Sequence, residues 1–118
     1  MPRIYTFKLS HKANPFMERI EQLKLFLDED PDDNFSLYAL ALEYVNIHHV
    51  SEAIELLEKL IQKNPDYLAS YYQLGKLFEQ QGNFSKASDA FTKGLVVARK
   101  QKNQKTLNEL QSALDSLE

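Results

Sequence analysis

The chain repeats itself at a spacing of 34 residues, and this regularity limits what it can fold into. Residues 34 positions apart match in size and chemistry along two successive stretches. The matched pairs are Leu40 with Leu74, Ala41 with Gly75, Tyr44 with Phe78, Ala53 with Ala87, and Leu57 with Phe91. A fixed period of this length is typical of arrays in which one supersecondary unit stacks on the next. The sequence therefore predicts a succession of equivalent units.

A partial third copy precedes the two full ones. The same offset places Leu23 on Leu57, Phe26 on Leu60, and the pair Pro31-Asp32 on Pro65-Asp66. We therefore divide the chain into a leader (1–13), a half repeat (14–31), a first repeat (34–67), a second repeat (68–101) and a C-terminal capping helix (102–118).

Each copy has the pattern of two helices, because its apolar residues recur at steps of three and four instead of alternating. The predicted helices cover 15–29, 35–47, 51–62, 68–81, and 84 to the late nineties. Near the C-terminus Leu107, Leu110, Leu114 and Leu117 follow the same spacing among polar residues. This pattern predicts an amphipathic helix whose polar outer face seals the last repeat. The expected fold class is all-α, with six helices.

Short turns are predicted between the paired helices. In the second copy Gly82 supplies the positive φ that ends a helix, and Asn83 caps the helix that follows. His48 and His49 occupy the same places in the first copy, and histidine is among the residues found more often at positive φ. Between copies, each Pro-Asp pair interrupts the helix, and its aspartate can cap the next one.

These residues resemble the signature of the tetratricopeptide repeat family. The first copy supplies Leu37, Leu40, Ala41, Tyr44, Ala53, Leu57 and Pro65, and the second supplies Tyr71, Leu74, Gly75, Phe78, Ala87 and Phe91. The resemblance covers residues 17–99 and implies a short α-solenoid of antiparallel helical hairpins. Arg99 stands where the signature has proline, so we expect the last helix of the second repeat to continue past the usual boundary. The resemblance also implies a protein-interaction module that is not an enzyme.

The predicted core and the predicted binding face follow from the stacking of such hairpins. Large residues that fill the space between helices are expected in the core, namely Leu40, Tyr44, Leu57, Leu74, Phe78 and Phe91. The first helix of each repeat then lines a concave face that can hold a peptide. Its predicted residues are Phe35, Tyr38, Leu42, Val45 and Asn46 in the first repeat and Ala69, Tyr72, Lys76, Glu79 and Gln80 in the second. The first group is mostly apolar and the second mostly polar or charged.

The chemistry of this face favours an apolar peptide or helix of a partner protein. Some family members that bind chaperone tails share a basic and asparagine clamp for a terminal carboxylate. This chain has Tyr38 and Leu42 in one helix and Ala69, Gln73 and Lys76 in the other, so it cannot assemble that clamp.

Two other occupants of the apolar surface stay open. The leader contains Ile4, Tyr5, Phe7 and Leu9, and could cover exposed apolar surface in its own chain or by exchange between subunits. Alternatively, the chain is a structural homo-oligomerisation domain, a possible homodimer, that pairs this surface with its own copy. Sedimentation analysis distinguishes a monomeric adaptor from a dimer that hides Tyr38 and Leu42.

Composition removes several other classes of function. A net charge of −3 and an isoelectric point near 5.6 give no general attraction for nucleic acid. The sequence has no cysteine and no run of apolar residues long enough to span a membrane, and we expect a cytoplasmic protein. The adjacent His48 and His49 lack a recognisable third ligand, so we expect no metal. His11 has no recognisable serine and carboxylate partners for a hydrolytic triad. We expect no cofactor and no catalytic site.

Overall fold

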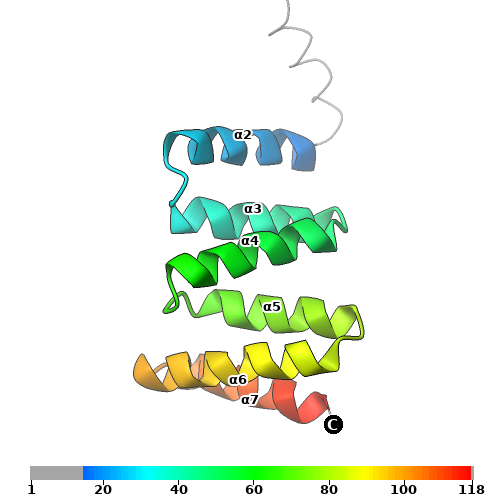
Figure 1. The fold of residues 1–118 in the computed structure, drawn as a ribbon, viewed down its shortest axis with the longest axis vertical. Helices are drawn as coiled ribbons and strands as arrows, with labels where there is room; N and C mark the ends of the chain where they lie inside the picture. The colour runs from blue at the N-terminus through cyan, green and yellow to red at the C-terminus, as the bar shows by residue number, and fades with distance from the viewer. Residues whose placement is uncertain (1–14, 118) are drawn as a thin grey trace, which may run out of the picture. The chain divides into compact units, whose positions relative to one another are not determined.

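The computed structural model describes residues 15–117, which form six α helices and no strand. The chain divides into two compact units, of which one ends at Ala53 and the other begins at Ile54. Figure 1 labels the helices from α2 to α7. The predicted all-α fold and the number of helices are confirmed for this part of the chain. The leader (1–13) lies outside the described residues.

The first unit is built on α2 (Pro15–Glu29) and α3 (Asn34–Asn46), and ends within the first turn of α4 (Val50–Lys63). Helices α2 and α3 pack together. Residues of α2, α3 and α4 that are almost fully buried here are Ile20, Leu23, Leu37, Leu40, Ala41 and Ala53. An ion pair between Arg19 Nε and Glu43 Oε1 at 3.5 Å links α2 to α3. Tyr44, which the sequence places in the core, is only half-buried.

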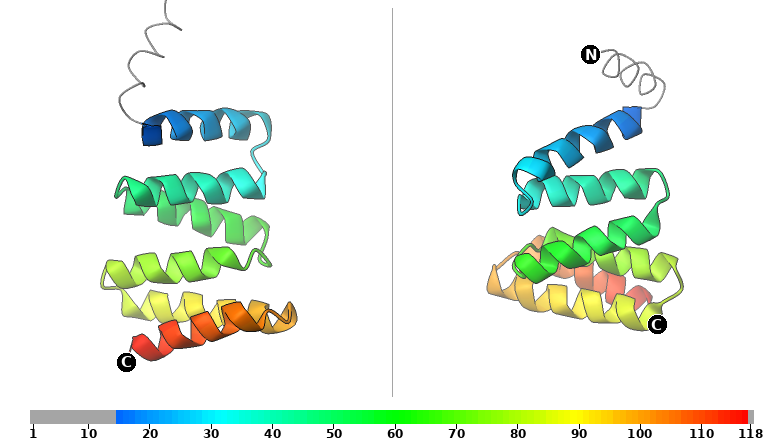
Figure 2. Two further views of the ribbon diagram at one scale, coloured as in Figure 1. Left: turned by 180° about the vertical axis from the view of Figure 1, so that it is seen from behind. Right: turned by 45° about the horizontal axis from the view of Figure 1, so that its top comes forward.

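The second unit contains the rest of α4 together with α5 (Ala69–Gln80), α6 (Phe84–Lys100) and α7 (Gln104–Ser116). Helix α6 packs against α5 and also against α7. The left panel of Figure 2, which views the structure from behind, shows α7 (orange to red) in front of α6. The predicted core residues Leu57, Leu74, Phe78 and Phe91 are buried, with Phe91 0% exposed. The core predictions in this unit are therefore correct.

Two glycines allow the helices of the second unit to approach closely. A Cβ atom on Gly75 of α5 would lie 2.3 Å from Cε1 of Phe91 on α6. A Cβ atom on Gly94 of α6 would lie 2.8 Å from Tyr71 Cβ on α5 and 3.0 Å from Leu110 Cδ1 on α7. Any larger residue at either position would push neighbouring helices apart, because core packing leaves no spare volume.

Three turns share one geometry. His48, Gly82 and Lys102 have φ angles of 64°, 78° and 58°. In each turn the next residue donates its backbone N–H to the carbonyl five residues earlier: His49 to Tyr44, Asn83 to Phe78 and Asn103 to Ala98, at 2.8–2.9 Å. This is the Schellman arrangement, in which a left-handed residue satisfies the last carbonyls of a helix. The predicted positive φ at His48 and Gly82 is confirmed, whereas Lys102 was not predicted.

Helix caps agree with the sequence in part. The side chain of Asn83 accepts a hydrogen bond from the Lys86 backbone N–H at 3.2 Å, as predicted for the start of α6. The cap of α3 is Asp33 instead of Asp32, and it accepts from the Ser36 backbone N–H at 3.2 Å. The prediction that Asp66 could cap α5 is wrong, since the cap residue there is Leu68 and makes no side-chain hydrogen bond.

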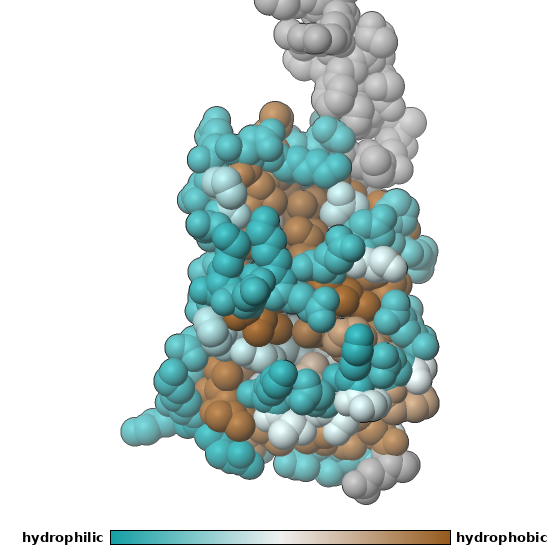
Figure 3. Space-filling view, in the orientation of Figure 1, coloured by the Kyte–Doolittle hydropathy of each residue, from teal (hydrophilic) through white to brown (hydrophobic). Residues whose placement is uncertain are grey.

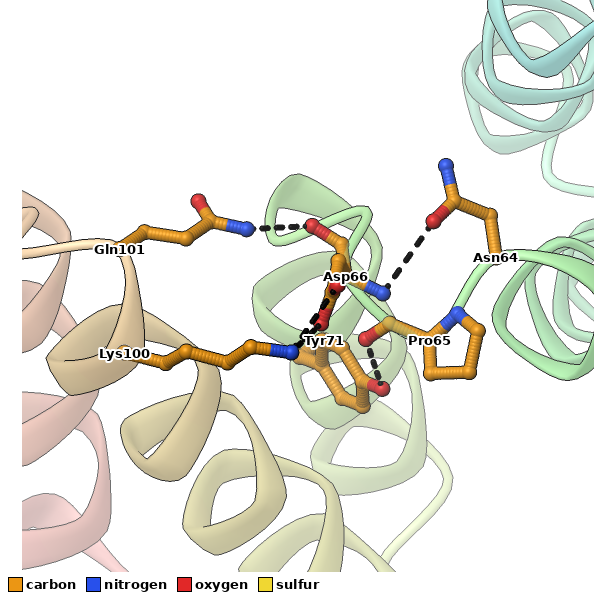
Figure 4. A network of polar contacts seen from close by, with 6 residues as sticks. All are labelled: Asn64, Pro65, Asp66, Tyr71, Lys100 and Gln101. Carbon is orange, nitrogen blue, oxygen red and sulfur yellow. Dashed lines mark hydrogen bonds and ion pairs between the residues drawn. The ribbon is translucent and has the colours of Figure 1, made fainter.

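Asp66 instead connects the turn before α5 to the end of α6 (Figure 4). Its carboxylate accepts from Lys100 Nζ at 3.1 and 3.2 Å, and its carbonyl accepts from Gln101 Nε2 at 2.6 Å. This contact is possible because α6 has 17 residues against 14 in α4, and so continues past the position of the missing proline. The predicted extension of this helix is confirmed.

Candidate functional site

Two of the predicted binding residues of the second unit, Tyr72 and Lys76, lie on the side of α5 that faces α7. Tyr72 and Lys76 line a hollow of about 390 Å³ together with five residues of α7. We call it the α5–α7 hollow; its α7 residues are Asn108, Glu109, Ser112, Ala113 and Ser116. The sequence analysis gave α7 only a capping role and therefore missed these five residues. These five residues form the small and polar side of the amphipathic pattern in α7, and the sequence analysis assigned that side to solvent.

Tyr72 and Lys76 are held in place by neighbours on α5 and α6. The Tyr72 ring is half-buried and lies 6.1 Å, centroid to centroid, from the Phe91 ring at an interplanar angle of 47°. Aromatic pairs favour such tilted geometry. Lys76 Nζ lies 3.2 Å from Glu79 Oε1 on the next turn of α5. The hollow thus presents one fixed aromatic ring beside a paired ammonium group.

The other predicted residues of α5 divide between two places. Lys76, Glu79 and Gln80 line a further open hollow of about 410 Å³. Ala69 is exposed and belongs to neither hollow. Together with the α7 residues of the hollow, this part of the predicted face is consequently polar, with amides, hydroxyls and charged groups around a single tyrosine. Such a surface is suited to hydrogen bonds with a peptide main chain and with polar side chains.

The predicted residues of the first unit lie on α3 and have a different character. Phe35 is 67% exposed at the start of the helix. Tyr38, Leu42 and Val45 are half-buried, and Asn46 is exposed at the last residue of α3. Three partly exposed apolar side chains and one exposed phenyl ring give this helix an apolar surface, which on free proteins is often a binding site.

We also searched the described part of the chain for a metal site, a histidine site and a membrane-spanning helix. Residues 15–117 contain no group of three histidine, cysteine, aspartate or glutamate side chains that could hold a metal ion. His49 stacks on Tyr44 with ring centroids 6.0 Å apart, and its Nδ1 lies 3.7 Å from Glu52 Oε2. None of the helices from α2 to α7 is long and apolar enough to cross a membrane.

Among the described residues, Tyr71 is a titratable group with a shifted pKa. Its hydroxyl donates a hydrogen bond to the Pro65 carbonyl at 2.6 Å (Figure 4). Burial raises the pKa of Tyr71 above its usual value, and the nearby carboxylate of Asp66 raises it further, while Lys93 acts in the opposite direction. The hydroxyl stays protonated at neutral pH, so its role is to hold the turn before α5 against the helix.

Comparison with known proteins identifies the family. The sequence model of the tetratricopeptide repeat matches residues 48–115, which is more than half of the chain. The chain belongs to the tetratricopeptide repeat family. Members of this family are typically interaction modules for other proteins instead of catalysts. The resemblance found in the sequence is therefore confirmed, and membership of this family supports a general role in protein–protein interaction.

Similar tetratricopeptide repeat proteins come from distant organisms. A TPR repeat-containing protein of Methanocaldococcus jannaschii is 30% identical over 97 residues, which cover 82% of this chain and 30% of the relative. The chain spans 30% or less of the length of the curated relatives it matches. The solution structure of a tetratricopeptide repeat domain protein from Salinibacter ruber is 43% identical, with a TM-score of 0.72, covering 75% of this chain and 90% of that one.

A more distant structure shares the fold alone. The Yersinia enterocolitica type III secretion chaperone SycD, solved in complex with a peptide of the translocator YopD, is 11% identical with a TM-score of 0.80. The match covers 98% of this chain and 90% of SycD.

Proposed function

We propose that this tetratricopeptide repeat module binds a segment of a partner polypeptide on the predicted concave face. The observation that carries the proposal is the α5–α7 hollow, in which Tyr72 and Lys76 lie beside small and polar residues of α7. A hollow of about 390 Å³ falls within the range of about 300–1,000 Å³ found for ligand sites. The fold neighbour SycD, which holds a peptide of YopD, supports a peptide as the kind of ligand.

The two parts of the predicted face differ in the ligand chemistry that each suits. The α3 surface, with Phe35 67% exposed and Tyr38, Leu42 and Val45 half-buried, suits apolar side chains. The α5–α7 hollow suits main-chain amides, which can bond to the side chains of Asn108, Ser112 and Ser116. We therefore propose that the α3 surface binds apolar side chains of a partner and that the α5–α7 hollow binds a polar segment, whereas the sequence predicted an apolar peptide.

Affinity capture from a native lysate tests the proposal. The wild-type chain is compared with a double variant, Tyr38→Glu with Leu42→Glu, and with Lys76→Glu. Lys59→Glu is the matched control, because Lys59 is exposed on α4 and lies outside both hollows. We expect the double variant and Lys76→Glu each to lose captured proteins that Lys59→Glu retains. Capture of the same set by all four chains would refute the assignment.

Self-association through the α3 surface is the competing function. Phe35 is among the few large apolar residues that are exposed in the described chain, and it would be covered in a homodimer. Sedimentation equilibrium of the wild-type chain and of the double variant separates the two functions. A dimer that dissociates only in the double variant supports homo-oligomerisation through α3.

A further inference from the structure

The second unit has another hollow, which shares no residue with the α5–α7 hollow. It has a volume of about 310 Å³ and is lined by residues of α4, α5 and α6. Its apolar lining consists of Ile61, Tyr71, Leu74, Phe78 and Ala90, and we call it the α4–α6 groove. In Figure 3, brown and pale atoms of this unit lie in a furrow between teal, hydrophilic ridges. Because an apolar cavity of about 150 Å³ admits benzene, the groove has room for a phenyl ring and a neighbouring aliphatic side chain.

The α6 wall of this groove carries an ammonium group without a carboxylate partner. Lys93 is paired with Asp89 at 3.1 Å, so its charge is compensated. Lys86 Nζ instead lies 5.5 Å from the centroid of the Phe78 ring, and within the described chain it has no ion pair. Lys86 is also in the first turn of α6, which contains no acidic residue. A cation there is disfavoured by the helix dipole, so a carboxylate placed beside Lys86 would be stabilised.

A segment of this same chain has the complementary chemistry. Near the end of α2, Leu25 is 63% and Phe26 57% exposed. Leu60, at the position of Phe26 in the next copy, is 0% exposed, so the repeat pattern alone does not explain an exposed ring there. Glu29 and Asp30 follow Phe26 by three and four residues and therefore lie on its side of the helix.

The charges at this end of α2 are also disfavoured by their own helix. The Asp30 backbone N–H donates to the Phe26 carbonyl at 2.9 Å, which carries the helical pattern as far as Asp30. Asp28, Glu29 and Asp30 are exposed there, and the last turn of α2 contains no basic residue. Carboxylates at the negative end of a helix dipole are destabilising, and a nearby cation would offset this cost.

We propose that the end of α2 in one copy of this chain docks in the α4–α6 groove of a second copy. The Phe26 ring enters the apolar floor, and the carboxylates of Glu29 and Asp30 approach Lys86. Glu58 on the α4 wall repels those carboxylates, which fixes the direction of α2 with its acidic residues toward α6. The residues before α2 suit the groove less well by charge, because positions 1–14 contain three basic residues and no acidic one.

The contact joins two different surfaces, each present once per chain. Such a heterologous contact closes into a ring or a reciprocal pair, or continues as an open chain. It is independent of the partner-binding face, since neither α3 nor the α5–α7 hollow takes part.

Sedimentation velocity of the full chain and of two variants tests the proposal. Phe26→Ser removes the anchor, and Lys86→Glu reverses the charge at position 86 of the groove. Neither is expected to unfold the chain: Phe26 is more than half exposed, and glutamate three residues after the cap Asn83 completes a capping box. Urea unfolding of each variant verifies this. Lys59→Glu is the control, because it makes the same charge change at an exposed residue that does not line the groove.

We expect the wild-type chain and Lys59→Glu to associate with increasing concentration. Each test variant should weaken association at least about tenfold, as for a central anchor. An equimolar mixture of the two variants provides one intact α2 end and one intact groove. The mixture should therefore form a 1:1 complex that grows no further. Four results would each overturn the proposal. The wild-type mass could be independent of concentration, both variants could still associate, or the mixture could stay monomeric. Finally, association could be lost only with Tyr38→Glu and Leu42→Glu.

Discussion

The fit between Gly75 and Phe91 gives the sharpest test of how the hairpins pack. Alanine at position 75 would place its Cβ 2.3–2.7 Å from three carbons of the Phe91 ring, which is fully buried and has no free space to move into. Overpacking of this kind costs about 1–3 kcal/mol. Replacing glycine within a helix returns about 1 kcal/mol in helix propensity. We therefore expect Gly75→Ala to lower the free energy of unfolding by about 0–2 kcal/mol.

The corresponding residues of the first copy suggest how to relieve this clash. At the positions of Gly75 and Phe91 that copy has Ala41 and Leu57, a larger residue matched with a smaller one. Phe91→Leu alone should cost about 1–2 kcal/mol through lost burial. In the double variant the new Cβ occupies the space that the ring leaves, so the net cost should be about 0–1 kcal/mol. The coupling energy is then about 2 kcal/mol, within the range seen for residues in contact.

Urea unfolding followed by far-UV circular dichroism measures all four chains of this cycle. Additive losses in the double variant, or a Gly75→Ala chain more stable than the wild type, would show that Gly75 is not required for the approach of α5 and α6.

Three further predictions concern single side chains. Ser70 is 0% exposed, and its hydroxyl has no hydrogen-bond partner among the described residues, whereas Ser36 at the matching position donates to Asp33. In thermal unfolding, Ser36→Ala should therefore be less stable than the wild type by about 1 kcal/mol, and Ser70→Ala should be equally stable or more stable. His48→Gly should raise the free energy of unfolding by about 0.5–1 kcal/mol, because a non-glycine residue at positive φ is strained; a decrease in urea unfolding would contradict this. The raised pKa of Tyr71 favours the neutral hydroxyl in the folded chain. The stabilisation from this hydroxyl is therefore complete below the ordinary tyrosine pKa and is lost as pH rises through the pKa of the folded chain. When the free energy of unfolding is measured from neutral pH upward, it should fall less steeply above about pH 10 in Tyr71→Phe than in the wild type.

Much of the fold could be predicted because the repeat places local signals in equivalent positions. His48 was expected at positive φ only because it aligns with Gly82, and the structure gives both the same turn. Lys102 adopts that turn as well, but it follows Gly82 by 20 residues and lies outside the 34-residue pattern. The pair Lys102-Asn103 did resemble Gly82-Asn83 through its capping asparagine, which accepts from the Thr106 backbone N–H at 3.1 Å.

The errors arose where tertiary contacts decide between local alternatives. Asp66 has the sequence context of a cap, yet it binds Lys100 and Gln101, whose approach depends on the length of α6. Tyr44 fits the core pattern but is half-buried, as its ring stacks on exposed His49.

The candidate site could be predicted on α5 but not on α7. Periodicity assigns one polar side to α7, and it does not say whether that side faces solvent or the neighbouring helix. The packing of Leu110 over Gly94 orients α7, and this orientation brings Ser112 and Asn108 to the same hollow as Tyr72.

Site-specific photo-crosslinking tests the central claim, that the side of α5 facing α7 holds a partner polypeptide. A photoreactive phenylalanine derivative replaces Tyr72 in one chain and the exposed Lys59 of α4 in another, and both are irradiated in native lysate. The account predicts a discrete crosslinked partner from position 72, lost when Lys76→Glu is added, and none of this partner from position 59. The same partner captured equally from both positions, or only from position 59, would contradict it.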